Sequence, residues 1–162
     1  MKNVLELLER TAARLPRQTA FADQQCSYDY QTVVNIAGSV GSALAANGDR
    51  NCPVAVLMER GAPCLVTLMG VLYSGNFYVV LDPEMPAERV NKILRTLQPT
   101  ALICDEAHKD DPAGLDYDGK VYSAEALAAG QAQPELLQTV RRRMIDTDPV
   151  SYTHLTLPTI LR

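Results

Sequence analysis

Charged residues stand directly after two apolar runs, where they could take part in chemistry. Glu59 and Arg60 follow Val54–Met58, and Asp82 follows a second apolar run and precedes Pro83. In open α/β sheets, residues after the carboxyl ends of strands often line the active site, where a carboxylate can move protons and an arginine can hold an anion. Structural interpretations are nevertheless favoured, namely an ion pair or helix entry for Glu59 and Arg60 and a turn for Asp-Pro.

Other reactive side chains give weaker indications of chemistry. His108 lies in a polar stretch, and we expect its ring to be solvated. Three adjacent arginines, 141–143, could suggest phosphate binding, but adjacent charges on a helix point in different directions, which favours a solvated helix end. The cysteines lack a C-x-x-C pair and zinc-site spacing. We therefore expect reduced, mostly buried thiols at Cys26, Cys52, Cys64 and Cys104.

The composition limits the classes of protein that fit. The 162 residues are 47% apolar and 21% charged, which excludes a disordered chain and indicates about one domain with a sizeable core. The net charge of −4 disfavours nucleic acid as a partner. No apolar run approaches the roughly 18 residues of a membrane span, and no secretory signal is recognisable. We expect a cytoplasmic protein with no membrane span.

The first third of the chain is expected to supply helices and one short strand. Asn3 and Glu6 resemble a capping box for an amphipathic helix that Pro16 ends. Asp29 is a plausible N-cap for a second helix. Gly38 and Gly41 weaken that helix unless another element packs closely against it. The expected elements are the first helix, a strand over Thr19–Asp23, and a helix from Tyr30 to Asn47-Gly48.

The middle of the chain alternates between apolar strands and amphipathic helices. Each strand is short and rich in β-branched or apolar residues, as in strands buried on both faces. Strand–helix–strand–helix–strand at this spacing predicts right-handed crossovers, and the fold class is α/β with a mostly parallel sheet flanked by helices. The expected strands are Val54–Met58, Phe77–Leu81 and Ala101–Cys104, and the helices begin near Pro63 and Pro86 and end at Ser74-Gly75 and Pro99.

The alternation of strands and helices is less distinct after Asp105. Residues 110–119 are polar and rich in turn formers. The expected elements are a short strand over Lys120–Tyr122, a short helix over Ser123–Ala129 and a helix over Gln131–Met144. No G-x-x-x-x-G-K-[ST], G-x-G-x-x-G or G-x-S-x-G motif occurs, so the residues alone indicate a soluble α/β domain without a visible active site.

One block of the sequence, residues 72–89, indicates a protein family more specifically than the rest of the chain. Residues 72–83 read Leu-Tyr-Ser-Gly-Asn-Phe-Tyr-Val-Val-Leu-Asp-Pro, and Pro86-Ala87-Glu88-Arg89 follows. This block resembles the L-K-A-G-x-A-Y-x-P-L-D-P…P-A-E-R signature of amino-acid adenylation domains in the AMP-forming ligase superfamily. Residues 28–33 are similar to that family's L-T-Y-x-E-L, and Glu59-Arg60 with Gly70-Val71-Leu72 is similar to its E-R-S…G-V-L. Departures from the family pattern are Tyr73 for Lys, Val80 for Pro and Thr32 for Glu.

The resemblance, which runs from about Asn3 to Pro149, implies a two-step reaction. ATP, with Mg²⁺, and an amino-acid carboxylate would give an aminoacyl adenylate and pyrophosphate, and the thiol of a carrier protein would then take the aminoacyl group. The family places its phosphate loop, ribose-binding Asp and late Lys further along the chain, and none has a matching position here. We therefore assign no catalytic, cofactor-binding or metal-binding residue, and we expect no cofactor to bind this chain.

The last residues have a different character. Relatives continue after the equivalent of Asp148-Pro149 into a Thr/Ser/Gly-rich loop, whereas Val150–Thr159 resembles the translation of a transposase adapter used in sequencing libraries. The alternative is a natural β-rich tail whose Tyr152 and Thr153 echo the family's Y-T-S. We interpret residues 1–149 as the N-terminal part of an AMP-binding adenylation domain and residues 150–162 as a foreign segment that is not native to this domain.

Two functional hypotheses follow. The first is the N-terminal part of an ATP-dependent amino-acid-activating enzyme, inactive by itself. The second is a non-enzymatic α/β binding module that shares only the superfold pattern. Because Met1 lies next to the first helix, we expect no condensation domain before it, which favours a D-alanine–carrier protein ligase or a peptide synthetase that begins with an adenylation domain.

Overall fold

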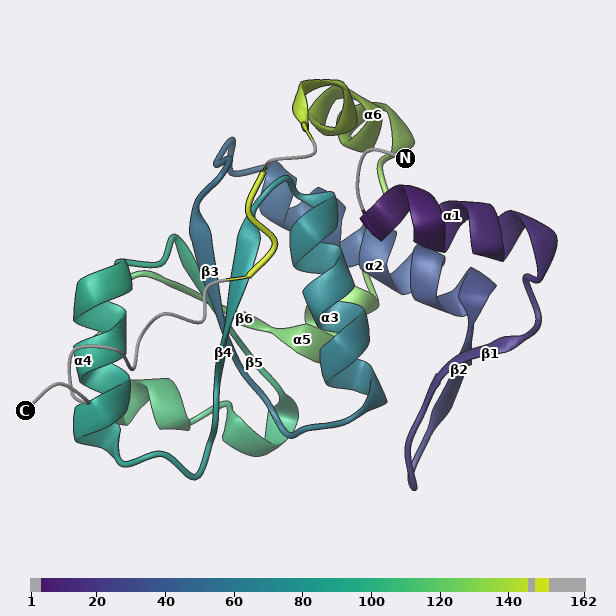
Figure 1. Cartoon of the computed structure of the whole chain (residues 1–162). Helices are drawn as coiled ribbons and strands as arrows, with labels where there is room; N and C mark the ends of the chain where they lie inside the picture. Colours follow the sequence, from purple (N-terminus) through teal and green to yellow (C-terminus); the bar gives the residue numbers. More distant parts are fainter. Residues whose placement is uncertain (1–3, 146–147, 152–162) are drawn as a thin grey trace, which may run out of the picture.

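The computed structural model describes residues 4–145 and 148–151, which form a parallel sheet between layers of helices (Figure 1). The α/β class and mostly parallel sheet predicted from the sequence are confirmed. In chain order the elements are α1 Val4–Arg14, β1 Thr19–Ala22, β2 Ser27–Asp29, α2 Tyr30–Ala45, β3 Pro53–Leu57, α3 Ala62–Tyr73, β4 Phe77–Leu81, α4 Ala87–Leu97, β5 Ala101–Cys104, the 3₁₀ turns η1 Glu106–His108 and η2 Asp111–Gly114, β6 Lys120–Ser123, α5 Ala124–Ala128 and α6 Pro134–Arg143.

The sheet of the described residues has four strands in the order β4-β3-β5-β6, all parallel. Strand β3 lies inside, with Val54 paired to Tyr78 of β4 on one side and to Ala101 of β5 on the other. All of β5 and all of β3 except Pro53 are buried. This burial explains the continuous apolar runs, because a parallel strand covered by helices on both faces has no polar side.

Successive residues of β3 face opposite layers of helices. Val54 and Val56 pack into one apolar cluster with α2, α3 and α5, and Ala55 and Leu57 pack into a second cluster with α4. Both clusters contain several fully buried side chains. Burying a side chain of this size stabilises the fold by about 1.5–3 kcal/mol. The two clusters together therefore hold α2, α3 and α5 on one face of the sheet and α4 on the other.

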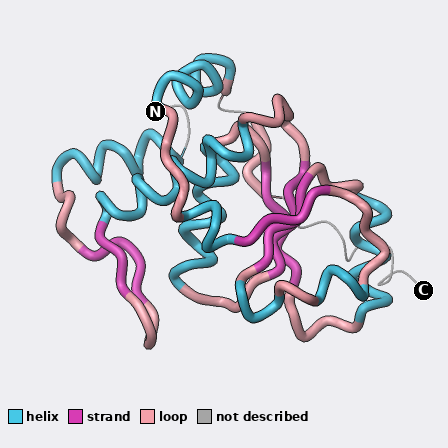
Figure 2. Tube along the Cα trace, turned by 180° about the vertical axis from the view of Figure 1, so that it is seen from behind, coloured by secondary structure: helices cyan, strands magenta, loops and turns pink. Residues whose placement is uncertain are grey.

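A third layer consists of α1 and the antiparallel β1–β2 hairpin, which pack on the outer side of α2 and α3. Figure 2 shows the hairpin projecting from the body of the molecule. Strand β2 was not predicted from the sequence. Its three residues are too few for an alternating pattern, and its pairing with β1 follows a turn in which the Asp23 carboxylate accepts hydrogen bonds from the N–H groups of Gln25 and Cys26.

The predicted bounds agree to the residue for β4 and β5 and differ by a few residues elsewhere. Helix α2 ends at Ala45, two residues before the predicted Asn47, and Gly48 then turns the chain at a φ of 81°. Helix α6 begins at Pro134 rather than Gln131, because proline favours the first turn of a helix. Asn3 of the predicted capping box lies outside the described residues. No helix in the part of the chain that the structure describes is long and apolar enough to cross a membrane.

Candidate functional site

Polar side chains gather where the parallel strands end. Beside this edge lies a cleft of about 460 Å³ between the β1–β2 hairpin and the segments that follow β3, β5 and β6. Four segments therefore contribute to one concave surface, the usual place for a ligand in an open α/β sheet. The residues that line the cleft are Asp23, Gln24, Gln25, Met58, Glu59, Arg60, Gly61, Pro63, Asp105, Glu106, Ala107 and Glu125.

Arg60 and Asp82 form an ion pair that joins the segments after β3 and β4. The Arg60 Nη2 atom is 2.5 Å from the Asp82 Oδ2 atom, and the Arg60 side chain is 84% exposed. Asp82 also accepts a hydrogen bond from the Glu84 N–H at 3.0 Å, which opens the predicted turn. That backbone bond and Arg60 lower the pKa of the Asp82 carboxyl. The structural interpretations of both residues are confirmed.

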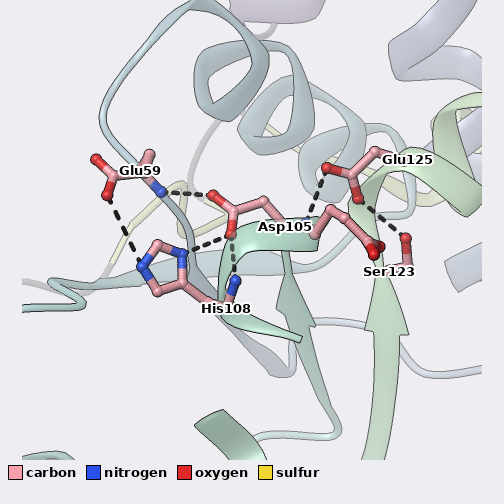
Figure 3. A network of polar contacts seen from close by, with 6 residues as sticks. Glu59, Asp105, His108, Ser123 and Glu125 are labelled. Carbon is pink, nitrogen blue, oxygen red and sulfur yellow. Dashed lines mark hydrogen bonds and ion pairs between the residues drawn. The ribbon is translucent and has the colours of Figure 1, made fainter. Parts of the chain in front are cut away.

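Asp105 is the central acceptor of this edge (Figure 3). Its Oδ2 atom accepts from the Glu59 N–H at 2.7 Å, and its Oδ1 atom accepts from the His108 N–H at 3.1 Å and lies 2.6 Å from the His108 Nδ1 atom. The carboxylate thus caps η1 and anchors the chain that leaves β3. The prediction that His108 is simply solvated is wrong, because its side chain is only 15% exposed and is held by Asp105.

Glu125 ties the segment after β6 to the same edge. Its Oε1 atom accepts from the Glu106 N–H at 3.0 Å, and its Oε2 atom accepts from the Ser123 hydroxyl at 3.0 Å. Ser123 in turn caps α5, since its Oγ atom accepts from the Ala126 N–H. These hydrogen bonds hold together the segments that follow β5 and β6.

Asp23 connects the hairpin to α3 across the cleft. Its Oδ2 atom accepts from the Ala62 N–H at 2.7 Å, in the first turn of α3. Hydrogen bonds from the backbone N–H groups of Ala62, Cys26 and Gln25 lower the pKa of Asp23 to about 2. A carboxylate at a helix N-terminus is favourable because the helix dipole is positive there.

A second concave region, of about 410 Å³, lies between α6 and helices α1, α2 and α3. At its rim Tyr73 donates from its hydroxyl to Glu9 at 3.0 Å, and Arg141 donates to the other carboxylate oxygen of Glu9 at 2.5 Å. The Arg141 guanidinium also lies 5.7 Å from the centre of the Tyr73 ring. Arg142 and Arg143 are exposed, but Arg141 is not part of a solvated end as predicted, because its guanidinium lies against Glu9 of α1 and the Tyr73 ring of α3.

The described residues offer few reactive groups. No cluster of three or more His, Cys, Asp or Glu in the described ranges could hold a metal ion. The cysteines are free; Cys64 and Cys104 are buried, and Cys26 and Cys52 are half-buried. Burial raises the pKa of Cys104 to about 12, so this thiol stays protonated and unreactive. The arrangement at the carboxyl edge can therefore position loops and accept hydrogen bonds.

The family signature maps onto one continuous stretch of the fold. Gly75, at a φ of 78°, turns the chain from α3 into β4, Asp82 and Pro83 end β4, and Pro86 precedes α4. A covered parallel sheet with such a strand–turn–helix unit defines the chain as an α/β domain. It belongs to the AMP-binding enzyme family, whose model matches residues 8–154.

Relatives of known sequence agree with that family. The chain is 27% identical over 135 residues to a plipastatin synthase of Bacillus subtilis, a match that covers 83% of this chain and 4% of the relative. It is 35% identical over 97 residues to pyochelin synthetase PchF of Pseudomonas aeruginosa, covering 59% and 5%. The chain therefore spans a small share of these curated relatives.

The fold itself matches solved peptide synthetases. The nonribosomal peptide synthetase FmoA3 in its α-methyl-L-serine-AMP-bound form superposes with a TM-score of 0.73 at 22% identity, covering 82% of this chain and 15% of that chain. The four-domain synthetase AB3403, solved with AMP and glycine, gives a TM-score of 0.72 at 19% identity, covering 85% and 10%. The family match and the curated relatives confirm the resemblance inferred from the signature motif, and the solved structures confirm the fold.

Proposed function

We propose that residues 1–149 form the N-terminal part of an enzyme that activates an amino acid with ATP. An amino-acid carboxylate oxygen would attack the α-phosphorus of ATP, forming aminoacyl-AMP and releasing pyrophosphate. A carrier-protein thiol would then attack the acyl carbon and release AMP. The observation that carries the proposal is the family match over residues 8–154, together with the Gly75–Arg89 signature at the turns around β4.

We infer that the nucleotide and Mg²⁺ are held outside this part of the enzyme, and that its described residues position the loops around the cleft. The described residues contain no candidate metal cluster. Arg60, on the cleft, is already paired with Asp82. We expect the groups that stabilise phosphate charge to lie elsewhere, because catalysis of this transfer depends on positioned cations and donors around the phosphates.

The peptide-synthetase relatives favour an amino acid and a carrier protein as partners. The proposal also includes a free-standing D-alanine–carrier protein ligase, because such an enzyme would carry out the same two reactions. We place the activity in the cytoplasm, where ATP is available.

We also propose that the native sequence gives way to a foreign segment after Pro149, so that residues 150–162 do not belong to the family domain. The family model matches as far as residue 154 and so includes Tyr152 and Thr153, which echo the family's Y-T-S; this overlap favours the alternative of a native tail. Sequencing an independent copy of the locus across Pro149 tests this boundary. A Thr/Ser/Gly-rich loop in place of residues 150–162 would support it, and the same tail in a second copy would overturn it.

The decisive experiment on function uses the protein encoded by the intact locus. Amino-acid-dependent exchange of pyrophosphate into ATP would be measured with each amino acid in turn, and loading of a holo-carrier protein would be measured with the amino acid that scores. A matched control replaces the late Lys of the downstream sequence with Ala. Exchange that this variant loses supports the proposal; an intact protein without exchange, and without the expected downstream motifs, would instead be a binding module.

A further inference from the structure

His108 lies between two carboxylates that come from different strands. Its Nδ1 atom is 2.6 Å from Asp105 Oδ1, and its Nε2 atom is 3.8 Å from Glu59 Oε1 (Figure 3). Asp105 follows β5 and Glu59 follows β3, two strands that pair in the sheet. The imidazole therefore bridges the exits of two neighbouring strands beside the cleft.

The two ring nitrogens differ in how firmly they are held. The Asp105 carboxylate already accepts from two backbone N–H groups, and an ionised carboxylate can only accept. Its short contact with Nδ1 requires a proton on that nitrogen. The other nitrogen, Nε2, then carries a proton only in the imidazolium form. In neutral imidazole, a lone pair on Nε2 would face the negative Glu59 carboxylate.

We propose that His108 is a proton-operated clasp, in which gain of a proton at Nε2 binds the Glu59 carboxylate and loss of that proton releases Glu59 into the cleft. The Asp105 contact persists in both states. Because Glu59 lines the cleft and its side chain is 76% exposed, it is free to move when released. The clasp thus changes the charge and shape of the cleft mouth.

The charges that face the ring from each neighbouring segment support the protonated state. They are Asp105, Glu59 after β3 and Asp111 of η2, all acidic. On its own turn, Glu106 and Lys109 pair with each other. The hydrogen bond with Asp105 raises the pKa of His108, burial opposes this, and the charges of Asp105, Asp111 and Glu59 add to the rise. The clasp is closed below this raised pKa and opens as the pH rises through it.

The test follows the ring nitrogens and the Glu59 carboxyl by NMR in the 162-residue chain. His154→Asn leaves His108 as the single imidazole. We expect a titration midpoint above 6.5, a neutral form protonated at Nδ1, and a step in the Glu59 side-chain carboxyl signal at the His108 midpoint. Glu59→Gln should lower that midpoint by a few tenths of a pH unit, the scale of an exposed ion pair.

Controls separate the clasp from general effects of charge. Glu106→Gln, on the same turn but paired with Lys109, should leave the Glu59 step in place. His108→Gln should abolish the step, and if this variant does not fold, Glu59→Gln still tests the contact from its exposed side. A neutral form protonated at Nε2, or a Glu59 signal that ignores the His108 titration, would overturn the proposal.

Discussion

Gly41 of α2 and Gly70 of α3 lie where the two helices cross, and the Gly70 carbonyl oxygen is 3.0 Å from the place a Cβ on Gly41 would occupy. The same Cβ would be 2.4 Å from the Tyr73 Cβ atom, and a Cβ on Gly70 would be 2.5 Å from that of Val40. This close approach explains why α2 contains internal glycines, which would weaken a helix that had no such neighbour. Helices α2 and α3 share the most extensive contact between any two described elements.

Gly41→Ala should therefore destabilise the fold. Alanine has an intrinsic advantage of about 1 kcal/mol over glycine within a helix. However, a Cβ at 2.4 Å from another Cβ forces the helices apart, and overpacking of this kind costs about 1–3 kcal/mol. We expect a net loss in the free energy of unfolding, measured by urea denaturation. Gly114→Ala, where a Cβ meets nothing within 4 Å, is the control and should stay within about 0.5 kcal/mol. A Gly41→Ala variant as stable as the parent would contradict the crossing geometry.

Asp23 should make stability depend on pH in the acid range. Its pKa is lowered from 3.8 to about 2 in the folded chain, so the stability it provides is present above the unfolded value and is lost as the pH falls through about 2. The Tm of Asp23→Ala should lie below that of the parent at pH 6, and the gap should narrow on acidification below about pH 4. Asp118→Ala, an exposed carboxylate, should show no such gap. A gap that is the same at pH 6 and pH 2 would argue against the Asp23 bridge.

The purified 162-residue chain should not catalyse amino-acid-dependent exchange of pyrophosphate into ATP. The resemblance implies a phosphate loop, a ribose-binding Asp and a late Lys that have no matching position in this sequence, and the described residues contain no candidate metal cluster. The assay would compare the chain with the protein encoded by an independently sequenced copy of the locus under the same conditions. Pyrophosphate exchange above background with the 162-residue chain would contradict this prediction.

Removal of residues 150–162 should change the free energy of unfolding by no more than about 0.5 kcal/mol, the scale of changes away from the core. Of this segment, the structure describes Val150, whose carbonyl accepts from the Tyr78 N–H at 3.1 Å, and Ser151, which bridges to Tyr78. Pairing with the open edge of β4 needs only backbone groups. Comparing urea denaturation of chains that end at Pro149 and Arg162 gives the measurement, and a loss of several kcal/mol would show that the tail belongs to the fold.

The sequence was most informative where one physical factor decides the structure. Phe77–Leu81 and Ala101–Cys104 were predicted to the residue because turn formers bound short apolar runs. Asp29 was predicted as an N-cap from its residue type and its place before a helix, and its carboxylate accepts from the Thr32 N–H at 2.8 Å. Local rules sufficed for these elements.

Long-range contacts explain what the sequence could not predict. His108 is three residues from Asp105 but faces Glu59, which lies far earlier in the chain, and only the parallel pairing of β3 and β5 brings them together. Arg141 meets Glu9 because α6 packs on α2 and α3, which also contact α1. An Asp-x-x-His pattern directly after a predicted strand was the signal that could have pointed to the first of these contacts.

The position of β3 inside the sheet has a consequence for how the chain is made on the ribosome. β3 is the first strand of this sheet to be synthesised, β4 adds to one side of it, β5 to the other, and β6 adds outside β5. None of these described strands has to separate two strands that are already paired. Growth from the inside outward lets the nascent domain consolidate as each helix–strand unit emerges, and it keeps β4 available as a growing edge for whatever sequence is translated next.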